Sequence, residues 1–195
     1  QALLQESFDL LGTVYDGHDL VDAALSRRPD VIVTDLSMPS LNGLDAIRKI
    51  VDQWPDTRFV VLTMHREAHL AAEAFAAGAR GYVLKTSASD ELIEAIREVA
   101  AGRAFITGQL SKDFFSIVFT PQKAGGAAEL TLRQREVVQL IAEGHTMKEV
   151  AARLNISRRT AETHKYEAMR ALGVNSTAAL VQFAVRKQLV DGETA

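Results

Sequence analysis

The stretch that decides the fold is Val31-Ile32-Val33-Thr34-Asp35-Leu36-Ser37-Met38-Pro39. Its β-branched run predicts a short buried strand of a parallel sheet, which Pro39 ends. An aspartate at the carboxyl end of such a strand lies at the edge where open α/β folds place their chemistry. Asp35 is therefore the first candidate functional residue, with a capping role for its carboxylate as the alternative.

Two further predicted strands end in residues with matching chemistry. Residues 59–62 run into Thr63, and residues 81–84 run into Lys85. In a parallel sheet, a carboxylate, a hydroxyl and an ammonium group then meet at one edge. This set suits a phosphorylated aspartate, because the carboxylate is the nucleophile and the other two groups bind phosphoryl oxygens. The alternatives are a loop cap for Thr63 and a solvated charge for Lys85.

Composition indicates a soluble globular protein. The 195 residues are 47% hydrophobic and 24% charged, and the chain is long enough for two small domains. No apolar run approaches membrane-spanning length and no signal-peptide pattern opens the sequence, so we expect a cytoplasmic protein without a membrane partner. The absence of cysteine excludes disulfides and thiolate metal sites. The five histidines show no zinc spacing, and no zinc is expected.

The net charge of −3 hides an asymmetry between the two halves of the chain. Residues 1–102 carry 9 Lys and Arg against 16 Asp and Glu, a balance of −7. Residues 130–188 carry 10 against 5, a balance of +5. The basic half is expected to meet a polyanion such as DNA.

Hydrophobic periodicity divides the first part of the chain into alternating strands and helices. Residues 1–9 are predicted to be the tail of a helix, and further helices are predicted over 18–28, 44–54, 67–77 and 89–99. A further strand is predicted over residues 10–14, which gives four candidate strands in all. This alternation predicts a parallel sheet with right-handed crossovers.

The second part of the chain is predicted to be helical. Residues 103–129 connect the two parts, with a possible short helix over 106–119 and a flexible linker at 124–128. Thr131 and Thr146 are predicted N-caps, for a helix to residue 143 and for a short helix after it. A turn at 156–157, a helix to residue 172 and a helix over 177–187 follow. A basic four-helix unit of this kind predicts a helix-turn-helix, with an ordinary small bundle as the alternative.

The third of these helices has one polar face, because Arg159, Glu162, Thr163 and Tyr166 follow each other at helical spacing. Ala161, Ala168 and Leu172 take the inward side. His164 lies near the margin and is expected to pack or to face phosphate. The candidates for phosphate contacts are Lys148, Arg158, Arg159, Thr160 and Lys165. The candidates for reading bases are Glu162, Thr163 and Tyr166.

Several motifs resemble a known family. Asp35-x-x-Met38-Pro39, Asn42-Gly43, Thr63 and Gly81-Tyr82-x-x-Lys85 resemble the receiver domain of a bacterial response regulator. Leu130-Thr131-x-Arg133-x-Arg135-Glu136-Val137, Ile141-Ala142-Glu143-Gly144, Lys148-Glu149-Val150-Ala151 and Leu172-Gly173-Val174 resemble the LuxR-type DNA-binding domain. Nearly the whole chain therefore resembles the NarL/FixJ subfamily of response regulators.

The resemblance implies a flavodoxin-like α/β receiver domain over residues 1–102 and an all-α helix-turn-helix domain over 130–190, joined by 103–129. It also implies a transcription regulator of a two-component system. A sensor histidine kinase would phosphorylate Asp35, Thr63 would move toward the phosphoryl group, and Tyr82 would turn inward. The C-terminal domain would bind DNA as a homodimer. The chain departs from the family at Glu162, where lysine is frequent, and at Ala161, where valine is frequent.

One expected element is missing from the pattern. The resemblance implies five strands in the order 2-1-3-4-5, with two acidic residues at the end of the first strand. In the family these acids, the phosphorylated aspartate and a backbone carbonyl, here that of Ser37, hold Mg²⁺. Residues 1–9 supply no such strand. Either this strand precedes residue 1 or the chain departs from the family here, and we expect the first. We also expect that these 195 residues bind Mg²⁺ poorly and accept phosphate slowly or not at all.

Two other functions remain open at this point. The receiver could be a phosphorylation-independent dimerisation module on a DNA-binding protein. Independently of this, Tyr82 could be a plain core residue. An aspartate-based phosphohydrolase would require a second acid two residues after Asp35, as general acid and base. Ser37 stands at that position, and we expect no enzymatic activity.

Overall fold

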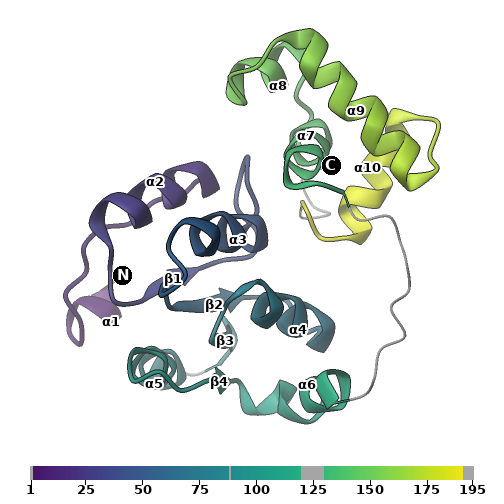
Figure 1. Cartoon of the computed structure of the whole chain (residues 1–195). Coiled ribbons are helices and arrows are strands. Elements are labelled where there is room, and N and C mark those ends of the chain that lie inside the picture. The colour runs from purple at the N-terminus through teal and green to yellow at the C-terminus, as the bar shows by residue number, and fades with distance from the viewer. Residues whose placement is uncertain (1, 88, 120–129, 191–195) are drawn as a thin grey trace. The chain divides into compact units, whose positions relative to one another are not determined.

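A computed structural model describes residues 2–87, 89–119 and 130–190, which form two compact units. The first unit is built mainly from residues up to 119, and the second mainly from residues after 130. The first contains a parallel sheet with helices, and the second is helical (Figure 1).

The sheet of the first unit has four parallel strands in the order β1-β2-β3-β4. They are β1 (Ile32–Thr34), β2 (Phe59–Thr63), β3 (Gly81–Leu84) and β4 (Phe105–Ile106). The register pairs Thr34 with Val61 and Thr63 with Leu84. The carboxyl ends of β1, β2 and β3 therefore lie next to one another.

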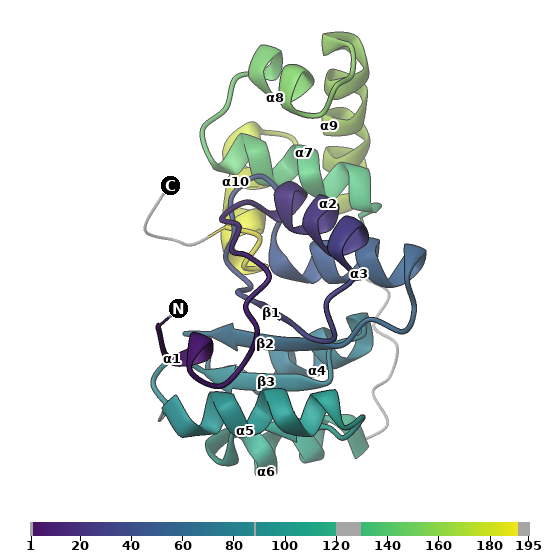
Figure 2. The ribbon, with the colours of Figure 1, turned by 90° about the vertical axis from the view of Figure 1, so that its left-hand side faces the viewer.

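Helices cover both faces of this sheet, with α5 on one face and α3 on the other (Figure 2). The helices are α1 (Ala2–Gln5), α2 (Gly17–Arg27), α3 (Gly43–Gln53), α4 (Ala68–Ala77), α5 (Ser89–Ala100) and α6 (Gly108–Phe119). On the α5 face, Val60 and Val83 of the sheet pack against Ala95, Ile96 and Val99. Burial of each large side chain in such a cluster contributes roughly 1.5–3 kcal/mol.

Most of the predicted elements of this unit are confirmed, including the strands that end at Asp35, Thr63 and Lys85. The predicted strand at residues 10–14 is wrong. A strand requires a neighbour with which to share its backbone hydrogen bonds, and β1 is an edge of the described sheet. The carbonyl of Leu11 instead accepts a hydrogen bond from Arg27 Nη1.

The strand β4 was not predicted, because two residues carry no periodicity of their own. Its position is set by backbone pairing, since the N–H of Phe105 donates to the carbonyl of Arg80 and the N–H of Thr107 to that of Tyr82. The predicted helix at 106–119 therefore begins at Gly108 and is confirmed from there.

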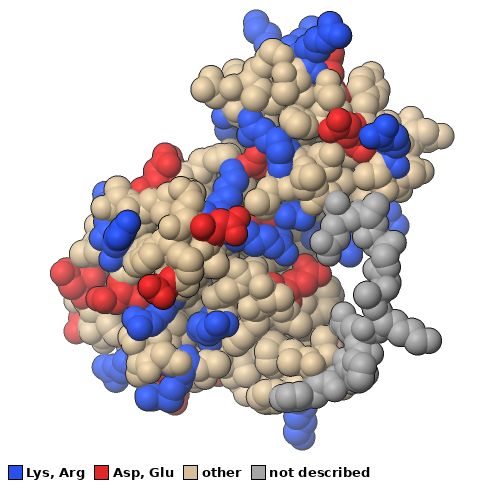
Figure 3. Space-filling model, in the orientation of Figure 1, with Lys and Arg blue, Asp and Glu red and all other residues tan. Residues whose placement is uncertain are grey.

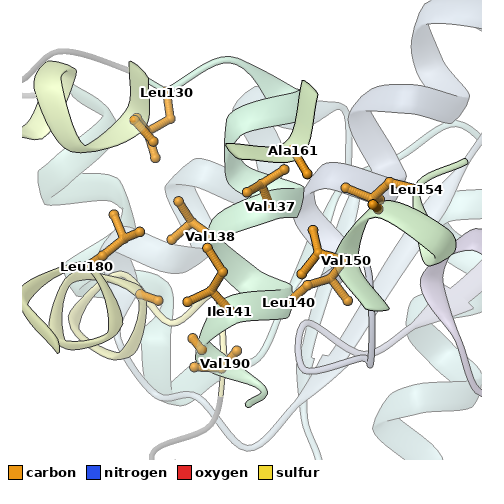
Figure 4. Packing of buried hydrophobic residues seen from close by; sticks show 14 residues of the cluster. Leu130, Val137, Val138, Leu140, Ile141, Val150, Leu154, Ala161, Leu180 and Val190 are labelled. Atoms are coloured by element: carbon orange, nitrogen blue, oxygen red, sulfur yellow. The ribbon is translucent and has the colours of Figure 1, made fainter. Parts of the chain in front are cut away.

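The second unit consists of α7 (Leu132–Ala142), α8 (Met147–Arg153), α9 (Arg158–Leu172) and α10 (Thr177–Arg186). The predicted caps are confirmed as capping boxes, Thr131 with Gln134 and Thr146 with Glu149. All four helices contribute to one apolar core, shown in Figure 4. Its fully buried members are Val137, Val138, Leu140, Val150, Ala161, Ala168, Leu180 and Ala184. The predicted linker at 124–128 lies outside the described residues.

Over the described parts of the chain, no helix is long and apolar enough to cross a membrane.

Candidate phosphorylation site and DNA-binding surface

The sheet brings the three predicted site residues of the first unit to adjacent strand ends. Asp35 follows β1, Thr63 ends β2 and Lys85 follows β3. The backbone N–H of Lys85 donates to the carbonyl of Thr63 over 2.8 Å, which fixes these two ends side by side. The convergence expected from the sequence is confirmed in the backbone.

The Lys85 ammonium group forms an ion pair with Oδ2 of Asp35. The Asp35 side chain is 25% exposed and that of Lys85 is 40% exposed, so the pair lies at the surface of the unit. A carboxylate that is held by a cation and still reachable from solvent suits a nucleophile that must meet a second protein.

Thr63 and Tyr82 are both fully buried, and their hydroxyl groups bind the same residue. The Thr63 hydroxyl accepts a hydrogen bond from the His65 N–H at 3.3 Å. The Tyr82 hydroxyl donates to the His65 carbonyl at 3.1 Å. The backbone just after β2 is therefore held between a residue of the candidate site and an inward-facing tyrosine.

Tyr82 is a neutral hydrogen-bond donor in this arrangement. Burial raises the pKa of its phenol well above the ordinary value, and the nearby carboxylates of Glu67 and Asp35 raise it further. Both causes disfavour the phenolate.

The loop that carries Asp35 packs closely against the backbone at the start of α3. The N–H of Gly43 donates to the carbonyl of Leu36 at 2.8 Å. A Cβ at residue 43 would lie 2.0 Å from the carbonyl oxygen of Asp35, so only glycine fits there without movement.

Thr107 is a buried residue of this unit that the sequence analysis missed. Its hydroxyl accepts from the N–H of Leu84 at 3.2 Å and donates to Glu91 Oε2 at 3.3 Å. Its carbonyl accepts from the N–H of Leu110 at 2.9 Å, at the start of α6. Thr107 thus ties the residue before Lys85 to α5 and α6, and no sequence pattern marks this role.

The residues present fit a Mg²⁺ site poorly. Nowhere in 2–87, 89–119 and 130–190 do three or more His, Cys, Asp or Glu side chains gather where they could hold a metal. The chain supplies the Asp35 carboxylate, which Lys85 already contacts, and the Ser37 carbonyl. Mg²⁺ requires near-octahedral oxygen coordination, and it is held by carboxylates together with waters and phosphate.

In the second unit, α8 and α9 form the predicted helix-turn-helix. Ser157 caps α9 by accepting from the N–H of Thr160 at 3.0 Å. Ala161 and Ala168 are fully buried, whereas Tyr166 is 66% exposed. The predicted inward and outward faces of α9 are therefore confirmed.

Hydrogen bonds on α9 restrict what its polar side chains can offer to a ligand. Arg158 Nε donates to Glu162 Oε1 at 2.9 Å, and the Thr163 hydroxyl donates to the Arg159 carbonyl at 3.0 Å. His164 is partly buried, with Nδ1 3.6 Å from Glu167 Oε2, as expected of a packing residue.

Basic side chains are visible on both units (Figure 3). Basic side chains gather over the end of the second unit where α8 meets α9, and acidic ones gather over α1 and α2 (Figure 3). The predicted phosphate-contact residues Lys148, Arg158, Arg159 and Thr160 are exposed, and Lys165 is partly exposed.

Comparison with known proteins gives matches to both parts of the chain. The family model described as "Response regulator receiver domain" matches residues 1–97. The model described as "Bacterial regulatory proteins, luxR family" matches residues 128–184. The chain is similar to the oxygen regulatory protein NreC of Staphylococcus carnosus, with 34% identity over 96% of this chain and 89% of that protein. NreC of Staphylococcus aureus (strain MRSA252) is 32% identical over the same shares.

Solved structures give the same result. RcsB from Salmonella enterica serovar Typhimurium, bound to the promoter rprA in the presence of a phosphomimetic, is 29% identical with a TM-score of 0.52. That match covers 93% of this chain and 88% of RcsB. A structure of two RcsB dimers bound to two parallel DNAs has a TM-score of 0.55 at 28% identity and the same coverage.

A parallel α/β unit with an aspartate, a threonine and a lysine at adjacent strand ends, followed by a helix-turn-helix, defines a response regulator. The chain belongs to the NarL/FixJ-type response regulators, in which a receiver domain is joined to a LuxR-type DNA-binding domain. Its family is one of DNA-binding transcription regulators.

Proposed function

We propose that a sensor histidine kinase transfers a phosphoryl group to Asp35 and that this transfer controls DNA binding by a dimer of the chain. The observation that carries the proposal is the partly exposed Asp35 carboxylate at the strand edge, with which the Lys85 ammonium group forms an ion pair. A carboxylate of this kind is accessible to the phosphohistidine of a kinase. A DNA target places the protein in the cytoplasm.

In the proposed transfer an Asp35 oxygen attacks phosphorus, and the bond from phosphorus to the kinase imidazole breaks. The electron pair returns to the imidazole nitrogen, and an acyl phosphate remains on Asp35. Lys85 is already in place to pair with a phosphoryl oxygen. In the family, Mg²⁺ supplies charge neutralisation for this step, and here Asp35 and the Ser37 carbonyl are the residues that would face it.

The hydroxyls of Thr63 and Tyr82, which both bond to the His65 backbone, could transmit a change at Asp35 to the surface of the unit. For Thr63 to donate to a phosphoryl oxygen, its hydroxyl has to leave the His65 N–H. Of the two hydroxyls, only that of Tyr82 then still bonds to the His65 backbone. The helix α4 begins three residues after His65. Phosphorylation would bias two existing arrangements of this segment, because a ligand shifts populations by its differential affinity.

The proposed DNA contacts lie on α8 and α9. Lys148, Arg158, Arg159, Thr160 and Lys165 would bind phosphates and set the register on the duplex. Glu162, Thr163 and Tyr166 would face base edges in the major groove.

A second candidate function is a receiver that dimerises without phosphorylation. Tyr82 favours it, because this residue is already fully buried and bonded to His65. The two candidate functions differ in whether a phosphodonor changes the affinity of the chain for DNA.

DNA affinity of the chain should therefore be measured with and without a small phosphodonor, at high Mg²⁺, for the parent and for Asp35→Asn. The proposal expects the donor to increase the affinity of the parent and to leave Asp35→Asn unchanged. An equal and donor-independent affinity of both proteins, in a parent whose Asp35 is shown by mass spectrometry to carry the phosphoryl group, would support the dimerisation module instead. Asp45→Asn is a poor control because Asp45 is buried, so Asp52→Asn, exposed on α3, serves as the control.

A further inference from the structure

Glu162 occupies a defined place on α9. Ala161 and Ala168 are fully buried and fix the side of the helix that packs on the core. Glu162 follows Ala161 and lies about 100° further around the helix, at the border of the outward face. Its side chain is 38% exposed, so the carboxylate reaches the surface that would enter the groove.

The outward face of α9 carries one carboxylate, Glu162, beside Arg159, Thr163 and Tyr166. The Thr163 hydroxyl donates its proton to the Arg159 carbonyl, which leaves its oxygen as an acceptor and its methyl group as an apolar contact for a base. Tyr166 presents a large exposed ring. Glu162, by contrast, brings a carboxylate that can only accept hydrogen bonds.

We infer that Glu162 makes cytosine the preferred base at one position of each half-site; this rests on the DNA binding proposed above and deepens it. In the major groove cytosine presents an amino donor. Guanine presents two acceptors and thymine presents an acceptor and a methyl group, so both repel or exclude a carboxylate. Adenine presents a donor beside an acceptor, and the acceptor opposes the second carboxylate oxygen.

Arg158 makes this reading compatible with the charge of DNA. An isolated carboxylate in the groove is repelled by phosphates on both strands. The Arg158 guanidinium donates to Glu162 through Nε, which leaves its two terminal nitrogens for phosphate oxygens. The Arg158 side chain is 71% exposed, so it reaches solvent beyond the carboxylate. The pair enters the groove with little net charge.

The test is selection of binding sites from randomised duplexes at low ionic strength, with the 195-residue chain and three variants. The parent should enrich cytosine at one position per half-site. Glu162→Gln should shift that position to adenine, because an amide pairs with the donor and acceptor of adenine. Glu162→Lys should shift it to guanine. Each variant should prefer its own base over cytosine by roughly tenfold.

Glu167→Gln is the matched control, since it removes the same charge from the same helix. The carboxylate of Glu167 lies 3.4 Å from Gln134 Nε2 of α7, and the variant should keep the parental cytosine. If Glu162→Gln and Glu162→Lys select the parental base at every position, the inference is wrong while DNA binding stands. If the parent enriches no sequence, the proposed DNA reading by α9 fails, and the inference fails with it.

Discussion

Replacement of Gly43 by alanine tests how tightly α3 is packed on the loop that carries Asp35. The added Cβ would lie 2.0 Å from the Asp35 carbonyl oxygen, 2.9 Å from its carbonyl carbon and 3.0 Å from Leu36 Cα. All three are backbone atoms, which cannot rotate away as a flexible side chain can. Because contacts under 3.0 Å are essentially never made by a Cβ, α3 or the loop has to move by about 1 Å.

The expected loss of stability follows from two opposing effects. Overpacking of this kind costs about 1–3 kcal/mol. Alanine in place of a helical glycine regains at most about 1 kcal/mol. We therefore expect Gly43→Ala to lower the free energy of unfolding of the first unit by about 1–2 kcal/mol, which lowers the urea midpoint by roughly 0.5–1 M.

The chain offers a selective probe for this measurement. Its single tryptophan, Trp54, follows α3 in the first unit, with the Arg28 guanidinium carbon 5.8 Å from its ring centroid. Tryptophan fluorescence during urea unfolding therefore reports on the first unit. Gly108→Ala is the control, because a Cβ there has no atom within 4 Å. A urea midpoint of Gly43→Ala equal to that of the parent would refute the close contact between residue 43 and the Asp35 backbone.

Three further predictions concern other parts of the molecule. Thr107→Val should destabilise the first unit by about 1–3 kcal/mol, because the buried Leu84 N–H loses its acceptor. The loss is measured by Trp54 fluorescence, and Thr107→Ser, which keeps the hydroxyl, should have a stability near that of the parent. Thr146→Ala should cost the second unit about 1 kcal/mol in thermal unfolding followed by circular dichroism. A hydrogen bond from the Thr146 N–H, and then one from its hydroxyl, lowers the pKa of Glu149 below its usual 4.5; the carboxylate therefore contributes to stability above that value, and the contribution is lost as the pH falls through the lowered pKa. An effect of Thr146→Ala that stays constant through this acidic range would contradict the capping box. Lys165→Ala should weaken binding to all DNA sequences and reduce the dependence of the affinity on salt concentration. Thr163→Ala should reduce the discrimination between bases at one position by about 1–3 kcal/mol. Binding curves identical to those of the parent for both variants would show that α9 is not the helix that reads the DNA.

The sequence predicted those features that depend on short-range patterns. The threonines before α7 and α8 were identified as caps because each hydroxyl directly precedes a helical pattern, and the structure shows that both form capping boxes. The strand ends at Asp35, Thr63 and Lys85 were found for a similar reason, since each follows a continuous apolar run.

The features that were missed depend on tertiary contacts. Residues 10–14 carry a strand-like composition, but a strand needs a neighbour, and composition does not supply one. The two residues of β4 are strand only because β3 lies beside them. The bond from Tyr82 to His65 joins residues 17 apart, and Thr107 to Leu84 joins residues 23 apart, so no local period predicts either.

The measurement that tests the central claim most directly is the site of phosphoryl labelling. The 195-residue chain, Asp35→Asn and the control Asp52→Asn should be incubated with a small phosphodonor at high Mg²⁺, and the acyl phosphate trapped by reduction and mapped by mass spectrometry. The account predicts slow labelling at Asp35 alone in the parent and in Asp52→Asn, and none in Asp35→Asn. Labelling of the parent at another residue, or labelling of Asp35→Asn to the same extent as the parent, would contradict it.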